Sequence, residues 1–137
     1  MRDTLYDSVP FRVPEIEHRY GPNVHLLADP LLLDLLAKLA ARETEQPTVN
    51  NLVVDIYRGL SRVVLNAEFP RKIVEVPTRM IEHTPEGVWR GQILEPETRA
   101  VTVNIARAGA VPSHTVYGIL NTVLLPAMKE VGDKFGA

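Results

Sequence analysis

A long run of apolar residues at helical spacing constrains the fold more than any other feature of this sequence. In the stretch "TVNNLVVDIYRGLSRVV", residues 48–64, aliphatic side chains recur every three or four positions. They are Val49, Leu52, Val53, Ile56, Leu60, Val63 and Val64. The opposite face is polar and carries Asn50, Asp55, Arg58 and Arg62. A helix with one apolar face must bury that face against other elements, so the rest of the chain has to supply them.

A second amphipathic helix is predicted just before the first. The stretch "ADPLLLDLLAKLAAR" opens with Asp29, which suits an N-cap, and Pro30, which suits the first helical position. Leucines then follow at helical spacing, namely Leu32, Leu35, Leu36 and Leu39. This helix is expected to pack through its leucines onto the core.

After the long helix the apolar period changes to two, which is typical of strands. The stretches "RKIVEVPTRM" and "GVWRGQIL" alternate on either side of a turn that contains Pro85, Glu86 and Gly87. Pro77 limits the first strand to an edge or to a short ladder, because proline lacks an N–H. We expect an antiparallel hairpin with an exposed tip.

A strand-turn-helix unit is predicted near the end of the chain. "VTVNIA", residues 101–106, alternates like a strand, and a glycine-containing turn follows it. The helical period returns with Ser113 as the expected N-cap. Pro126 either kinks this helix or begins a separate short one. The whole chain therefore reads as a mixed α/β protein.

The turn of this unit is the candidate binding site. Arg107 stands where the expected strand ends, and the small residues Ala108 and Gly109 would let a ligand approach the backbone. With the amides of the following helix and the hydroxyls of Ser113 and Thr115, they describe a site for phosphate or pyrophosphate. In the alternative interpretation, Gly109 only turns the chain and Arg107 pairs with a surface carboxylate. No catalytic residue is assigned.

Composition excludes several classes of function. The chain of 137 residues has no cysteine, which excludes disulfides and thiolate chemistry. None of its four histidines, His18, His25, His83 and His114, lies at helical metal-pair spacing from another, so no metal site is assigned. A net charge of -2 and the lack of a long apolar run argue against nucleic-acid and membrane partners, and we expect a cytoplasmic location.

Two regions are expected along the chain. Residues 1–24 contain Pro10, Pro14 and Pro22 and little periodicity, so they are interpreted as an extended N-terminal arm. Residues 25–137 form a single α/β domain in this interpretation.

From about His25 to Leu125 the chain resembles the N-terminal half of a uracil phosphoribosyltransferase. "HLLADPLLLDLLAKLAAR" and "TVNNLVVDIYRGLSRVV" resemble the first two helical segments of that family. "IVEVPTRM" resembles the beginning of its hairpin, and "VNIARAG" resembles the "ILRAG" strand and loop that contact pyrophosphate. In this comparison Arg107 matches the arginine of the pyrophosphate loop, and Ala108 and Gly109 match its small neighbours.

The resemblance implies half of a type I phosphoribosyltransferase-like fold, with two N-terminal helices, a hairpin arm and one strand-loop-helix unit. It implies phosphoribosyl pyrophosphate and uracil as substrates, UMP and pyrophosphate as products, and Mg²⁺ in the complete enzyme, although no magnesium site is evident in this chain. It also implies a homo-oligomer formed through the hairpin, residues 72–94, and the N-terminal helices.

Two segments of that family are absent from these 137 residues. They are the phosphate loop, an acidic strand end followed by a Thr-Gly-Gly or Thr-Gly-Ser turn, and the later segment that reads uracil. We therefore expect this chain alone to be inactive. The alternative hypothesis is a non-catalytic oligomerisation or regulatory module derived from the same fold.

Overall fold

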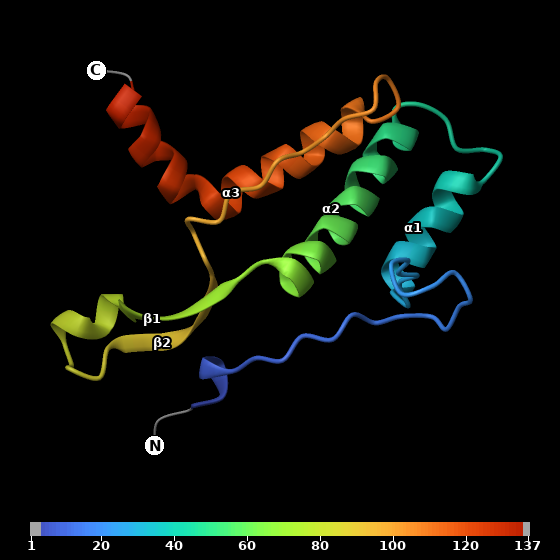
Figure 1. Cartoon of the computed structure of the whole chain (residues 1–137). Coiled ribbons are helices and arrows are strands. Elements are labelled where there is room, and N and C mark those ends of the chain that lie inside the picture. The colour runs from blue at the N-terminus through green and yellow to red at the C-terminus, as the bar shows by residue number, and fades with distance from the viewer. Residues whose placement is uncertain (1–3, 136–137) are drawn as a thin grey trace.

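The computed structural model of the chain describes residues 4–135. In this range the chain forms a small α/β domain with three α-helices and a two-stranded antiparallel sheet (Figure 1). The elements follow in the order 3-10 helix η1 (Thr4–Asp7), α1 (Pro30–Ala40), α2 (Thr48–Glu68), β1 (Arg71–Pro77), 3-10 helix η2 (Arg79–Glu82), β2 (Val88–Leu94) and α3 (Ala110–Phe135).

Helix α1 begins where its capping residues predict. The carboxylate of Asp29 accepts hydrogen bonds from the backbone amides of Leu31 and Leu32, at 3.0 and 3.1 Å. Pro30 occupies the first turn, where its missing N–H costs nothing. The prediction of Asp29 as N-cap and Pro30 as first helical residue is confirmed.

Helix α2 is the centre of the helical part, because it contacts both α1 and α3. Its bounds agree with the predicted start near Thr48. Gly59 lies against α1: a β-carbon at this position would come within 3.2 Å of the Leu32 side chain. The glycine therefore permits a close approach of the two helices, which offsets its low helix propensity.

The hairpin is present and extends away from the three helices (Figure 1). Val76 pairs with Trp89, and Pro77 pairs with Val88 at the end of the ladder. The first strand ends there rather than continuing through Met80, because the backbone turns into η2. Proline at the strand end matches its predicted limit on the ladder.

An ion pair closes the base of the hairpin. The Lys72 ammonium lies 2.9 Å from the Glu95 carboxylate. This hydrogen bond is the main cause of the lowered pKa of Glu95. The positive charge of Lys72 stabilises the ionised carboxylate of Glu95, so the ion pair links the start of β1 to the residue that follows β2.

The N-terminal segment runs extended past the helices to the hairpin. Its backbone makes one bridge to a later part of the chain, in which the amide of Ile16 donates to the carbonyl of Leu26 at 2.7 Å. The Arg71 guanidinium donates to the carbonyl of Val9 at 2.7 Å. These contacts hold residues that are distant in sequence against the domain.

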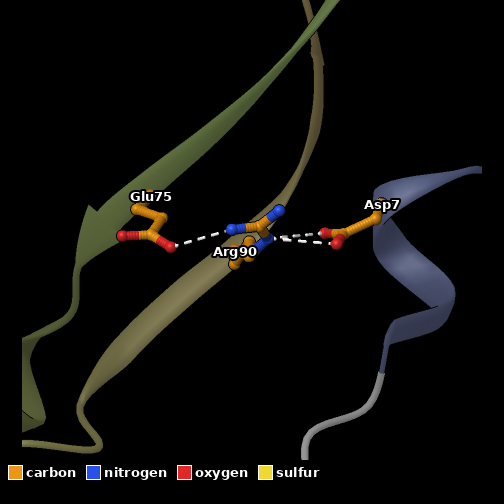
Figure 2. Close-up of polar contacts among 3 residues, drawn as sticks. All are labelled: Asp7, Glu75 and Arg90. Atoms are coloured by element: carbon orange, nitrogen blue, oxygen red, sulfur yellow. Dashed lines mark hydrogen bonds and ion pairs between the residues drawn. The ribbon is translucent and has the colours of Figure 1, made fainter.

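An arginine on β2 ties the start of the chain to both strands (Figure 2). The Arg90 Nε donates to both carboxylate oxygens of Asp7, at 3.2 and 3.0 Å, and its Nη1 donates to Glu75 at 3.1 Å. Both carboxylates raise the pKa of Arg90, Asp7 most strongly. The guanidinium thereby joins η1, β1 and β2.

The third predicted strand is not formed. Residues 101–105 are extended but belong to no sheet, and a turn follows over residues 106–109. Helix α3 begins at Ala110, three residues before the expected N-cap Ser113. It continues through Pro126 as one helix with a visible bend, which agrees with the kink rather than with a separate helix (Figure 1).

The core of the described residues is small. Leu52 and Leu65, both on α2, are its only buried hydrophobic side chains, at 8% and 7% exposure. The accessible surface of the chain is 11364 Å². This value exceeds by about 4,200 Å² the surface expected for a compact monomer of 15.3 kDa. No helix in the described part of the chain is long and apolar enough to cross a membrane.

Candidate functional site

The turn with Arg107 is built by local backbone hydrogen bonds. The amide of Gly109 donates to the carbonyl of Ile105 at 2.9 Å, and that of Ala110 donates to the carbonyl of Arg107 at 3.1 Å. The peptide bond between Ala106 and Arg107 is cis. Arg107 and Ala108 are exposed, and Gly109 is partly covered.

Glycine is required at position 109 by its own chain. A β-carbon there would lie 2.8 Å from the carbonyl oxygen of Ile105 and closer still to the side chain of Asn104. The space next to Gly109 is thus filled by residues 104–105. A ligand would have to reach the turn from the side of Arg107 and Ala108.

The start of α3 offers few free amides for an anion. Ala110 and Ser113 donate their amides to the carbonyls of Arg107 and Gly109, and Pro112 has no N–H. Among the described residues of this first turn, Val111 is left with an amide that no backbone acceptor engages. Phosphate sites at helix N-termini depend on several such donors.

A polar cleft of about 390 Å³ lies between α2 and α3. It is lined by Arg58 on α2 and by His114 and Thr115 on α3. Its full lining is Val54, Arg58, His114, Thr115, Gly118, Ile119 and Thr122. The lining of the cleft therefore includes one arginine, one histidine and two threonines.

The hydrogen bonds of these groups leave some of their capacity free. Arg58 Nη1 donates to Asp55 at 3.1 Å, with both side chains at least half exposed, so the other guanidinium donors face water or a ligand. The hydroxyl of Thr115 donates to the carbonyl of Val111 at 3.0 Å, so its hydrogen is not free for an anion. The cleft can bind a small anion through the free donors of Arg58.

An apolar groove of about 340 Å³ lies on another face of the same helix pair. Its walls come from α2, α3 and the extended segment after β2. Its lining residues are Tyr57, Leu60, Ser61, Val64, Leu65, Phe69, Ala100, Val101, Thr102, Val116, Ile119 and Leu120. The groove carries no charged side chain, so it suits aliphatic groups rather than an anion.

The structure divides the residues that the sequence grouped together. Thr115 lines the polar cleft, whereas Arg107, Ala108 and Gly109 form the turn before α3, and Ser113 lines neither cavity. Arg58 was missed as a site residue, since in sequence it is one of several charges on the outer face of a helix. No local pattern connects it with His114, more than fifty residues later.

The residues of the turn do not fit a magnesium ion. Mg²⁺ is held by carboxylate and phosphate oxygens, and the side chains of Arg107, Ala108 and Gly109 supply neither. Over the part of the chain that the structure describes, no three His, Asp or Glu side chains gather as a possible metal site.

Comparison with known proteins adds no relative. No protein-family model, no curated protein and no solved structure matches the chain.

Proposed function

We propose that this chain is an assembly module that associates with further copies of itself. The observation that carries the proposal is its exposed surface, about 4,200 Å² above that of a compact monomer of the same mass. Obligate homodimers bury roughly 2,000–5,000 Å² in total, mostly apolar. The excess is large enough for such an interface.

Exposed apolar side chains on two elements are available for this association. On α1, the side chains of Leu31, Leu33 and Leu36 are 66%, 47% and 52% exposed. On the hairpin, Ile73 and Val76 are 48% and 46% exposed. Exposed aliphatic groups on a projecting hairpin and on a helix are typical of surfaces that become buried in an oligomer.

The proposal includes descent from a uracil phosphoribosyltransferase. What supports it is the order of two helices, a hairpin, a turn with Arg-Ala-Gly and a helix, in the same order as the sequence resemblance. In the complete enzyme, uracil and phosphoribosyl pyrophosphate would give UMP and pyrophosphate, with Mg²⁺. This chain would contribute assembly surfaces and no turnover of its own.

Sedimentation equilibrium of the purified chain tests the assembly. The apparent mass should rise with concentration, and the double variant Leu31→Lys, Val76→Lys should stay near the monomer mass. Glu43→Lys, at an exposed site beyond α1, is the control and should associate like the wild type. A wild-type chain that remains monomeric up to about 100 µM would refute the proposal.

An activity assay tests the proposed lack of turnover. The purified chain, incubated with uracil, phosphoribosyl pyrophosphate and Mg²⁺, should form no detectable UMP. Formation of UMP well above a blank without protein would show that the chain is a complete catalyst.

A second candidate function, anion binding, is favoured by the polar cleft. Arg58, His114 and Thr115 line one cavity there, and a pyrophosphate group would match the charge and the free N–H donors of the Arg58 guanidinium. Isothermal titration with pyrophosphate should show binding that Arg58→Ala weakens by about 1.5–3 kcal/mol. Arg62→Ala, on the same helix but outside the cleft, is the matched control.

The turn gives the alternative location for the same ligand. If Arg107→Ala weakens pyrophosphate binding and Arg58→Ala does not, the anion binds at the turn. If neither substitution changes the affinity, the chain has no anion site at either position.

A further inference from the structure

Residues 101–105, "VTVNI", form an extended segment without a partner. Its side chains Val101, Val103 and Ile105 are 90%, 88% and 81% exposed, more than any other large apolar residue of the described chain. Among the described residues, no backbone N–H of this segment donates a hydrogen bond. Figure 1 shows the segment as a bare trace between β2 and α3.

These features are those of a β-strand that lacks its neighbour. Valine and isoleucine are strong strand formers, and the alternation places three of them on one face. Exposed unpaired backbone together with an apolar face is the template onto which another strand adds. The segment also borders the apolar groove through Val101 and Thr102, so an added strand would lie next to further apolar surface.

We propose that residues 101–105 pair with the same residues of a second copy of this chain, antiparallel about a two-fold axis at Val103. This inference rests on the proposed self-association and names the strand through which it occurs.

The sequence of the segment favours a copy of itself as the partner. A two-fold axis at Val103 places Val101 opposite Ile105 and Thr102 opposite Asn104. All apolar side chains then share one face, because directly opposed residues of antiparallel strands point to the same side. A shift by one residue would bring apolar and polar side chains together on each face, so the register is specified.

Charge and area set the limits of this interface. Arg99 and Arg107 flank the segment, and the two-fold axis brings Arg99 of one copy towards Arg107 of the other. Like charges at that point confine the pairing to residues 101–105. The excess exposed surface of about 4,200 Å² leaves room for this strand pair within a dimer of ordinary size.

Single-cysteine cross-linking tests the arrangement directly, because the chain has no cysteine of its own. In the proposed pair, the two copies of position 103 have Cα atoms about 4.5–5.5 Å apart, within disulfide reach. The two copies of position 101 are separated by four residues along the paired strands, or about 14 Å, which is too far for a disulfide. Val103→Cys should therefore form a disulfide-linked dimer under oxidised glutathione, at least about tenfold faster than Val101→Cys.

A mixture supplies the second readout. Val101→Cys combined with Ile105→Cys should cross-link rapidly, although each variant alone should not. Circular dichroism of every variant, compared with the wild type, shows that it is folded. Equal rates for Val103→Cys and Val101→Cys would overturn the two-fold at Val103, as would a mixture no faster than its components.

The outcome separates this inference from the proposed function. A chain that sediments as a dimer while Val103→Cys cross-links no faster than Val101→Cys retains the assembly and loses the strand pair. A chain that sediments as a monomer loses both.

Discussion

Replacing Leu36 by alanine should cost more stability in concentrated than in dilute solution. Burying a leucine side chain completely stabilises a protein by about 1.5–3 kcal/mol relative to leaving it exposed. Leu36 is 52% exposed in the isolated chain, so about half of that, roughly 1 kcal/mol, should be lost in dilute solution. If α1 is covered on assembly, the remaining half adds about 1 kcal/mol more.

Urea unfolding followed by circular dichroism measures this difference, at about 2 µM and about 200 µM protein. Leu65→Ala is the matched control, because Leu65 is 7% exposed and is already buried within the single chain. Its loss should be about 3 kcal/mol at both concentrations, as for other buried leucines.

Two results would refute the reasoning. If Leu36→Ala costs the same free energy at both concentrations, the apolar face of α1 is not covered by association. If Leu65→Ala costs no more than Leu36→Ala in dilute solution, Leu65 is not part of the core.

Three further predictions concern single contacts. Asp29→Ala should lower the free energy of unfolding, measured in urea, by about 1 kcal/mol, because two amides of α1 lose their acceptor. Asp34→Ala, which removes only an exposed ion pair, should cost clearly less, and equal losses would contradict the capping role of Asp29. Because the pKa of Glu95 is lowered in the folded state, its ion pair with Lys72 contributes stability above pH 4.5, and this stability is lost as the pH falls through the folded pKa. Lys72→Met should flatten this part of a plot of unfolding free energy against pH, and an unchanged slope would argue against the ion pair. Arg90→Gln should speed trypsin cleavage after Arg12, in the N-terminal arm, while the hairpin stays intact, and an unchanged rate of this cleavage would show that Arg90 does not hold the arm.

The elements with strong local signals could be predicted from the sequence. Asp29 and Pro30 mark the start of α1 because a cap and a first-turn proline act within a few residues. The hairpin is also local, since its strands are joined by a short connection and its alternation is regular. In each case the physical cause lies inside the segment itself.

The segment 101–106 shows where local signals fail. Its alternation is typical of a strand, but a strand exists only when a neighbour accepts its hydrogen bonds, and the described chain provides none for it. Helix α3 begins at Ala110, four residues earlier than an N-cap at Ser113 predicts, because its first turn accommodates Pro112, at a position where proline is tolerated.

The candidate cleft could not be predicted for a different reason. Arg58 and His114 line the same cavity only because α2 and α3 pack together, and no local sequence pattern marks either residue for this cavity. The resemblance drew attention to Arg107 and its neighbours in the turn instead. Long-range packing decides which polar side chains share a cavity, and periodicity does not reveal it.

The double contact of Arg90 also orders the events of folding. Glu75 is 15 positions away in sequence and lies on the paired strand, whereas Asp7 is 83 positions away. Closing the shorter loop costs less entropy, so the hairpin should form first and place the guanidinium where Asp7 can reach it. The N-terminal segment, although synthesised first, should thus be among the last parts of the chain to reach its folded position.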